Sequence, residues 1–178
     1  MSSKGGTPRR LTSQNYYQQS RPQFLNEKAL VYGAYPMYPN TTNYLFKADI
    51  STGRTKILTP KTNPTTDNYL GSDPDVSRDG QKIVFISDRI QSYAYDLFLM
   101  NSDGRKQTPL NITKISRYNQ NPVFMPNGKS ILFLASTSSN AGSRPIFSLW
   151  QVNINGSNPR QIAGSGLFTN PLTWKRGT

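Results

Sequence analysis

The sequence predicts an all-β fold, built as a short propeller or an open arc of repeated four-stranded units. The first observation is a repeat of about 50 residues, since Pro22, Pro74 and Pro122 are separated by 52 and 48 residues. The second is a pair of short apolar runs at 83–86 and 131–134, whose β-branched and aromatic residues predict buried strands. A period of this length is typical of propellers, in which one unit cannot bury its apolar surface alone.

Glycine turns divide each unit into strands. Asp79-Gly80 and Asn127-Gly128 precede the apolar runs, where a tight hairpin needs a positive φ. A second phrase in every unit ends in a glycine that marks another hairpin: Gly53, Gly104 and Gly156. The segments 105–113 and 157–163 then supply a fourth, more polar strand. Four strands joined by three turns make one propeller blade.

The whole chain, 1–178, is predicted to be a single propeller-type domain. Three complete repeats are expected, at about 20–60, 72–113 and 120–163. Residues 4–12 match a fourth strand that follows a glycine turn, and residues 170–178 match the opening strand of another blade. Partial strands of a fourth blade are therefore expected at both termini. Because a typical propeller has four to eight blades, the array is either compact and incomplete or an arc with exposed strand edges.

The phrase at Pro74–Gly80 resembles the TolB-type propeller repeat, in which a Pro-Asp-x-Ser-x-Asp-Gly turn precedes an apolar strand. Asp96–Gly104 matches the second half of that repeat. Pro122–Gly128 is a weaker match, Pro22–Lys28 lacks the glycine, and Gly5–Thr12 is similar to the usual blade ending. The resemblance covers nearly the whole chain, and it implies a non-enzymatic scaffold that binds proteins.

The resemblance also implies where such a protein works. The best-known TolB-type proteins are periplasmic and carry a signal peptide and an extra domain, and we expect neither in this protein. Short cytoplasmic relatives occur in cyanobacteria, and similar repeats appear within linker proteins of some phycobilisomes. A short cyanobacterial-type member, associated with phycobilisomes as a linker, is therefore one implied identity.

Composition excludes several kinds of site. The sequence contains neither cysteine nor histidine, which removes thiolate metal sites, disulfides and the commonest general base. It also lacks the G-x-S-x-G motif of serine hydrolases. We therefore predict no enzymatic activity, no cofactor and no small-molecule substrate. No apolar stretch approaches the roughly 20 residues of a membrane span, and the opening residues do not form a secretory signal, so a soluble cytoplasmic protein is expected.

Four carboxylates near the second repeat raise the question of a metal site. Asp73, Asp75 and Asp79, with Asp88 nearby, offer oxygen ligands that suit calcium. Their spacing differs from that of an EF-hand, and the third repeat has Asn or Val at the corresponding positions. Asp and Asn often cap turns by bonding the local backbone. The prediction is turn capping and no metal.

The net charge of +12 is unevenly distributed along the chain. All nine acidic residues lie between Glu27 and Asp103. The final 75 residues contain no acid and nine basic residues: Arg105, Lys106, Lys114, Arg117, Lys129, Arg144, Arg160, Lys175 and Arg176. The two ends of a ring or arc are expected to come near each other, which predicts a positive edge that steers an acidic partner. The alternative is that the charge serves solubility alone.

Aromatic residues beside cations mark the candidate contact residues. Tyrosines follow the arginines near the N-terminus, and the loops at 33–44, 88–95 and 136–145 are expected to project from the same side. We predict this partner-binding set: Arg9, Arg10, Tyr16, Tyr17, Tyr35, Tyr38, Arg144, Arg160, Lys175 and Arg176. Such residues suit protein hot spots. They also suit single-stranded nucleic acid or plain packing, and these readings stay open.

The predicted function is a scaffold or linker that docks its basic edge onto an acidic multi-subunit protein assembly. Phycobilisomes are one such assembly, because their pigment proteins are acidic and their linkers basic. This function places the protein in the cytoplasm, at the cytoplasmic face of a thylakoid or plasma membrane within a large complex. The alternatives are a basic nucleic-acid-binding module and a TolB-like envelope protein.

Overall fold

The fold is all-β. The computed structural model describes residues 7, 10–12, 16–18, 20–36, 42–60, 70–136 and 146–166. Within these ranges the only helix is a single 3-10 turn, η1 at Ile112–Lys114. The same ranges contain no helix long and apolar enough to cross a membrane. The predicted fold class is therefore confirmed.

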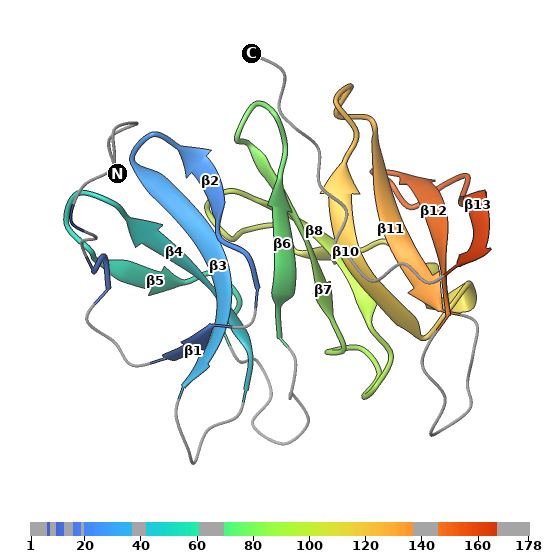
Figure 1. The fold of residues 1–178 in the computed structure, drawn as a ribbon, viewed down its shortest axis with the longest axis horizontal. Helices are drawn as coiled ribbons and strands as arrows, with labels where there is room; N and C mark the ends of the chain where they lie inside the picture. The colour runs from blue at the N-terminus through green and yellow to red at the C-terminus, as the bar shows by residue number, and fades with distance from the viewer. Residues whose placement is uncertain are drawn as a thin grey trace.

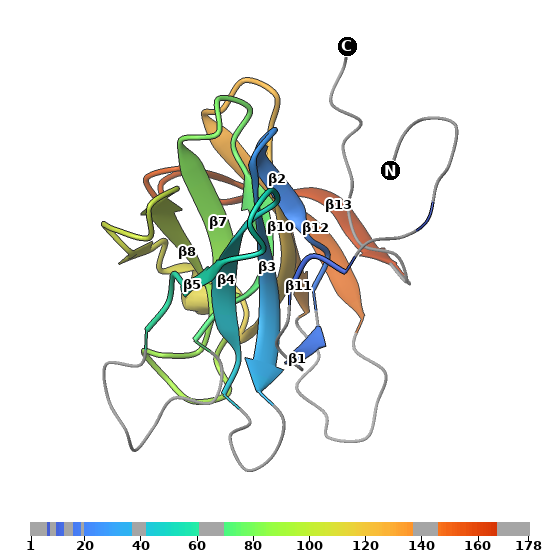
Figure 2. The same ribbon diagram turned by 90° about the vertical axis from the view of Figure 1, so that its left-hand side faces the viewer.

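Three antiparallel sheets, blades 1 to 3, stand side by side as an open arc (Figure 1). Blade 1 contains β1 Tyr16–Gln18, β2 Gln23–Asn26, β3 Ala29–Pro36, β4 Tyr44–Asp49 and β5 Thr55–Ile57. Blade 2 contains β6 Ser72–Val76, β7 Lys82–Ser87, β8 Asp96–Asn101 and β9 Thr108–Pro109. Blade 3 contains β10 Tyr118–Phe124, β11 Ser130–Ser136, β12 Phe147–Asn153 and β13 Arg160–Gly166. Seen from the side of blade 1, the sheets lie one behind another (Figure 2).

The first strand of blade 1 is divided in two. β1 pairs with the end of β3, where Tyr17 faces Tyr35, and β2 pairs with its beginning, where Phe24 faces Leu30. In blade 3 the continuous strand β10 occupies both positions, with a bulge after Gln120. Blade 1 therefore reaches back to β1, a few residues before the repeat start predicted at about 20. The three-residue strand β1 has no apolar run such as those at 83–86 and 131–134.

The hairpin turns follow the sequence prediction. Gly80 and Gly128 both adopt positive φ, at 70° and 66°. The carboxylate of Asp79 accepts hydrogen bonds from the Ser77 hydroxyl at 2.6 Å and the Gln81 N–H at 3.0 Å. The Asn127 side chain accepts one from the Lys129 N–H at 2.9 Å. The predicted turn capping by local backbone bonds is confirmed at both turns.

Two other carboxylates join blades instead of capping turns. Asp75 accepts a hydrogen bond from the Phe124 N–H at 2.8 Å, so a side chain of blade 2 bonds the backbone of blade 3. Asp73 has a φ of 46°, and its carboxylate accepts a bond from the backbone of Asn121. Burial raises the pKa of Asp73. For these two residues the prediction of local turn capping is wrong, because the innermost strands of neighbouring blades lie within bonding reach.

The acidic residues near the second repeat are spread over the blade. Asp79 is on the turn between β6 and β7, whereas Asp88 follows β7 at the other end of that strand. Across the described ranges, no three acidic side chains gather as a metal site would require.

Apolar side chains fill both spaces between the blades. Alternate residues of β7 point in opposite directions, so Ile83 and Phe85 pack toward blade 1 while Val84 and Ile86 pack toward blade 3. This arrangement explains the unbroken apolar run at 83–86, because a strand buried on both faces needs no polar side. A third cluster lies on the outer side of blade 1, where the rings of Tyr32 and Phe46 stack at 5.5 Å.

The predicted terminal strands are only partly described. Of residues 4–12, the structure describes Thr7 and Arg10–Thr12, none of which is in a strand. The predicted strand at 170–178 lies outside the described residues.

Candidate protein-interaction surface

The two ends of each blade are built differently. β3, β7 and β11 finish, and β4, β8 and β12 begin, at the lower end in Figure 1, which we call the loop end. The opposite end, the turn end, contains the short glycine hairpins. The connection at 88–95 is the loop of this kind that the structure describes throughout. It lies at the loop end, as predicted for the loops between the second and third strands.

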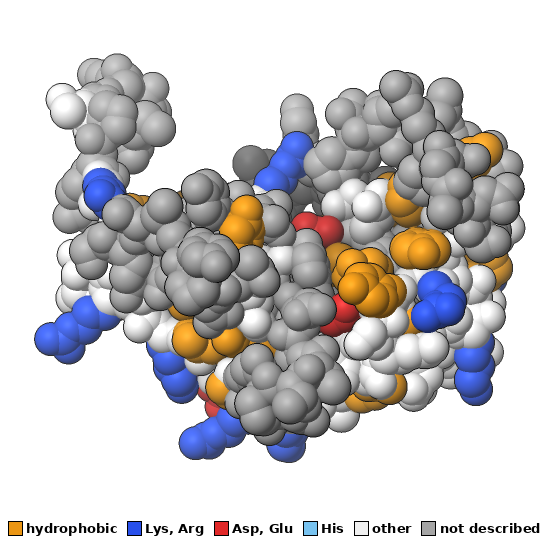
Figure 3. Space-filling view, turned by 90° about the horizontal axis from the view of Figure 1, so that it is seen from below, with side chains coloured by type: hydrophobic (Ala, Val, Ile, Leu, Met, Phe, Trp, Pro, Cys, Tyr) orange, Lys and Arg blue, Asp and Glu red, His pale blue; other side chains and the backbone are white. Residues whose placement is uncertain are grey.

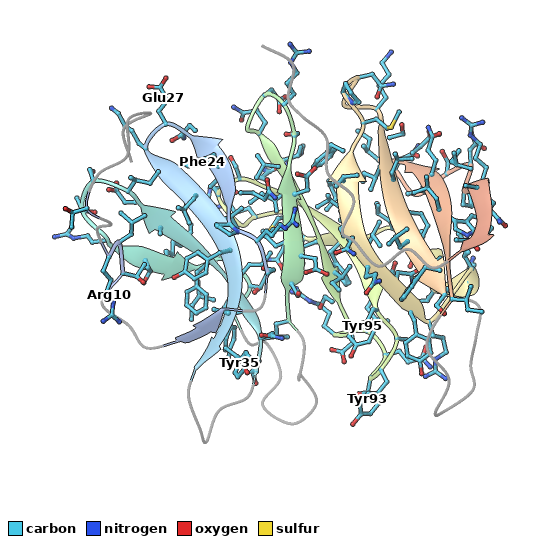
Figure 4. The ribbon with its side chains drawn as sticks, in the orientation of Figure 1. Arg10, Phe24, Glu27, Tyr35, Tyr93 and Tyr95 are labelled. Atoms are coloured by element: carbon cyan, nitrogen blue, oxygen red, sulfur yellow. The ribbon has the colours of Figure 1, made fainter. Side chains whose placement is uncertain are left out.

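Large apolar side chains are exposed at the loop end. Ile90 is 62% exposed and Tyr93 is 66% exposed, and both belong to the 88–95 loop of blade 2. Tyr118 and Ile146 of blade 3 are exposed as well. Tyr118 faces Ser136 across the ladder, and Ser136 faces Phe147, the residue after Ile146. Figure 4 shows Tyr93 and Tyr35 extending from the same lower end of the molecule.

Hydrogen bonds hold the 88–95 loop against blade 3. The Tyr95 N–H donates to the Arg117 carbonyl at 2.9 Å. The Asn119 side-chain amide donates to the carbonyls of Tyr95 and Ser116, each at 2.7 Å. Within the loop, the Tyr93 N–H donates to Asp88 at 3.3 Å. The exposed tyrosines of blades 2 and 3 are therefore parts of one connected surface.

The charge of this surface is basic within the described ranges. Lys114 and Arg117 are exposed, whereas the carboxylates of Asp88 and Asp96 are buried. Asp96 accepts a hydrogen bond from the Ile112 N–H at 3.0 Å, and burial raises its pKa. Viewed from this end, apolar side chains lie in a group beside a basic side chain, and acidic side chains are visible near the centre of the view (Figure 3).

The acidic residues of the turn end are exposed or partly exposed: Glu27, Asp49, Asp79 and Asp103. The Ser51 hydroxyl at 2.6 Å and the backbone of Thr52 lower the pKa of Asp49 to about 2. The Ser77 hydroxyl likewise lowers the pKa of Asp79. The carboxylates of Asp49 and Asp79 accept hydrogen bonds from their own turns. Acidic side chains are visible at both ends, and at the loop end the exposed charged residues next to Tyr118 are basic, Lys114 and Arg117.

Arg89 has a packing role beside this surface. Its guanidinium lies over the rings of Phe85 and Phe98, at 5.6 Å and 4.9 Å from their centroids. It donates to the side chain of Gln107 at 2.6 Å and to the carbonyl of Leu70. Because Gln107 in turn donates to the carbonyl of Leu58 in blade 1, Arg89 ties the first two blades together.

The structure describes some of the predicted contact residues and brings two of them together. Tyr17 and Tyr35 are ladder partners in blade 1, although the side chains of Tyr16 and Tyr17 are not described. Arg10 is exposed beside blade 1 (Figure 4), and its guanidinium donates to the Thr12 carbonyl at 2.7 Å. Arg160 is exposed on β13 at the other end of the arc and donates to Gln151 at 2.9 Å. The described arginines are therefore not neighbours.

The remaining predicted contact residues lie outside the described residues: Arg9, Tyr38, Arg144, Lys175 and Arg176. Sequence reasoning did not single out Tyr93, Tyr118 or Ile146, whose side chains the structure leaves exposed. The 88–95 loop was recognised, but its closeness to Tyr118 depends on the bond between Tyr95 and Arg117. No sequence pattern indicated that bond.

Solved structures share this fold. A TolB protein of Agrobacterium tumefaciens superimposes with a TM-score of 0.66 at 21% identity, covering 92% of this chain and 56% of the other. TolB from Acinetobacter baumannii gives 0.62 at 16% identity, covering 89% and 35%. The fold is that of a TolB-like propeller. The chain spans little more than half, or about a third, of the length of these TolB proteins.

Part of a solved peptidase structure resembles the chain as well. The Pyrococcus horikoshii acylaminoacyl peptidase gives a TM-score of 0.62 at 10% identity, covering 86% of this chain and 26% of the peptidase. No protein-family model and no curated protein matches the chain.

Proposed function

We propose that this chain is a non-catalytic protein-interaction module whose loop end binds an acidic protein partner. The observation that supports it best is the grouping of exposed Tyr93 and Tyr118 with Arg117, where the nearby carboxylates Asp88 and Asp96 are buried. Tyr and Arg are enriched among the residues that dominate binding energy at protein interfaces. An acidic protein with apolar contact residues complements such a surface in both charge and hydrophobicity.

The charge of the whole chain supports the same kind of partner. A net charge of +12 accelerates the approach of an acidic protein, and the effect weakens with added salt. The basic edge and the aromatic residues predicted from the sequence are proposed as a second contact region of the same partner.

A non-catalytic role agrees with the side chains that are present. The sequence lacks histidine and cysteine, the commonest general base and the thiol nucleophile. The peptidase relatives share with this chain a region of about a quarter of their length. The proposal therefore assigns binding to this chain and no bond-making chemistry.

Affinity capture with matched variants tests the proposal. The tagged chain is compared with a Tyr93→Ala/Tyr118→Ala variant in extracts of the source organism, and the captured proteins are identified by mass spectrometry. Ile57→Ala is the control, since Ile57 is also exposed but lies on β5, away from the loop end. We expect acidic proteins to be retained by the parent chain and the control and lost from the double variant. Equal retention by all three would contradict the proposal.

The same charge makes nucleic acid the competing ligand. Binding to a single-stranded polynucleotide would fall steeply with salt, because phosphate contacts release counterions. Filter binding of polyuridylate and of polyglutamate separates the two ligands. Stronger retention of polyuridylate at low salt, with the same dependence on Tyr93 and Tyr118, would replace the protein partner by nucleic acid.

A phycobilisome is the specific acidic assembly proposed, with a cytoplasmic location for the chain. This part rests on the sequence resemblance and the basic charge. Gradient sedimentation of native complexes tests it, and finding the chain only in light fractions would contradict it. A TolB-like envelope protein is the second candidate, favoured by the two TolB structures. Recovery of the chain from the periplasmic fraction would favour the envelope role.

A further inference from the structure

The contact between blades 1 and 2 and the contact between blades 2 and 3 are built in the same way at the outer strands. A Cβ added at Gly104 of blade 2 would stand 3.1 Å from the carbonyl oxygen of Leu58, at the end of the outer strand of blade 1. A Cβ added at Gly156 of blade 3 would stand 2.6 Å from the carbonyl oxygen of Leu110 of blade 2. Leu58 and Leu110 are both buried. The glycine turn of one blade therefore packs against a leucine of the preceding blade.

The inner strands complete the same contact. Val76 of β6 and Phe124 of β10 occupy equivalent positions, since they face Ile83 and Ile131 across their ladders. Val76 shares a buried cluster with Leu58, and Phe124 shares the next cluster with Leu110. Each contact thus combines an outer leucine of the preceding blade with an inner apolar residue of the following blade.

One corresponding residue on each outward face of the array is exposed, whereas Tyr32 and Phe46 on the outer face of blade 1 are buried within one copy. Ile162 of β13 comes directly after Gln161, which faces Trp150 across the ladder. Leu58 and Leu110 likewise come directly after the residues that face Phe46 and Phe98. Ile162 is 44% exposed.

Phe24 of β2 faces Leu30 and so occupies the position of Val76 and Phe124, yet it is 60% exposed (Figure 4). The outer face of blade 3 and the outer face of blade 1 therefore each present one half of the same contact.

We propose that blade 3 of one copy packs against blade 1 of a second copy, and that two copies close a six-bladed ring. A head-to-tail contact closes into a ring when its rotation allows. Two copies of three blades give six, which lies within the usual range of four to eight, whereas three copies give nine. Charge does not favour this pairing, because blade 1 contains five basic residues beside Glu27 and Asp49 and blade 3 contains no acid, so the contact rests on its apolar residues.

A segment of the chain competes with the second copy. The carbonyl of Leu11 contacts the position of Gly53 in blade 1, as Leu58 contacts Gly104 and Leu110 contacts Gly156. Within one copy, Arg10–Thr12 therefore occupy the position beside Gly53 that Ile162 of a second copy occupies in the ring. Closure displaces this segment, so the ring forms at high concentration and the single chain persists at low concentration.

Analytical ultracentrifugation of the full chain over a range of concentrations tests the ring. The 20.0 kDa chain should reach twice that mass and no more. Phe24→Asp and Ile162→Asp should each raise the dissociation constant at least about tenfold, as loss of a central contact does. Gln161→Asp is the matched control, because it adds the same charge to the opposite face of β13 and should leave the dimer intact. Circular dichroism confirms that each variant is folded.

Mixing the two variants tests the direction of the contact. Phe24→Asp retains the face of blade 3 and Ile162→Asp retains the face of blade 1, so an equimolar mixture should recover one contact and form a heterodimer. Leu11→Asp, which weakens the competing segment, should raise the dimer fraction. A parent chain that stays monomeric at every concentration overturns the proposal, as does a mixture that stays monomeric or assembly into species larger than a dimer.

Discussion

The turn end and the loop end are built from the same strands, but their side chains differ in hydrogen bonding and exposure. At the turn end, Asp49 and Asp79 bond their own hairpins, and glycines seat on the neighbouring blade. At the loop end, the backbone is bonded between blades while Tyr93 and Tyr118 are left exposed. The difference teaches that side chains at the turn end stabilise the fold, whereas the loop end combines bonds between blades with exposed tyrosines that folding does not need.

The largest expected effect is at a turn-end glycine. Gly156→Ala should destabilise the protein by about 2–4 kcal/mol, because φ is 81° and the new Cβ would overlap the Leu110 carbonyl. Gly128→Ala is the control, since its φ is 66° but no atom lies near its Cβ position, so it should cost only about 1–2 kcal/mol. Urea denaturation measures both. Equal losses in the free energy of unfolding would contradict the view that turn glycines pack against the neighbouring blade.

The next effect concerns the carboxylate that joins blades 2 and 3. Asp75→Ala leaves the Phe124 N–H without its acceptor and should cost about 1–3 kcal/mol in the free energy of unfolding. Asp75→Asn keeps a side-chain oxygen in the same place and should recover most of that loss. Thermal unfolding of the two variants measures this difference. An alanine variant as stable as the parent would show that the bond between Asp75 and Phe124 does not stabilise the contact between blades 2 and 3.

Acid titration should separate the two ends. Hydrogen bonds from Ser51 and Thr52 lower the pKa of Asp49 to about 2, so its stabilising effect is complete above the unfolded value of 3.8 and is lost as pH falls toward 2. Burial raises the pKa of Asp96, so Asp96 lowers stability as pH rises from 3.8 through its folded value. Asp49→Asn should therefore flatten the acid side of the stability curve. Asp96→Asn, which can still accept from Ile112, should raise stability at neutral pH.

The smallest effect on stability is expected at the loop end. Tyr93→Ser should change the free energy of unfolding by no more than about 0.5 kcal/mol, because the side chain is 66% exposed. The same substitution should weaken partner capture. A loss of several kcal/mol in the free energy of unfolding would instead show that Tyr93 stabilises the fold, which would contradict the distinction between the two ends.

The fold could be predicted because a repeat shows the same signals several times. Gly80 and Gly128 mark equivalent turns, and the runs at 83–86 and 131–134 mark equivalent buried strands, so each supports the other. β1 was missed because it is only three residues long and contains no apolar run.

The candidate surface was predictable only in part. Loop positions follow from the order of the strands, which placed 88–95 at the loop end. The bonds from Tyr95 to Arg117 and from Asp75 to Phe124 join separate blades, and neither has a local sequence signal. The exposure of Tyr118 likewise depends on its place at the start of β10, where side chains of neighbouring strands do not cover it.

The bond between Asp75 and Phe124 has a consequence for the order of synthesis. Its two partners are separated by 49 residues, so the middle blade emerges from the ribosome well before the backbone that satisfies its carboxylate. Until then the Asp75 carboxylate lacks the Phe124 N–H, and water must solvate it instead. The bond that joins blade 2 to blade 3 can therefore form only late in synthesis, and contacts between residues so far apart in sequence favour slow folding of the nascent chain.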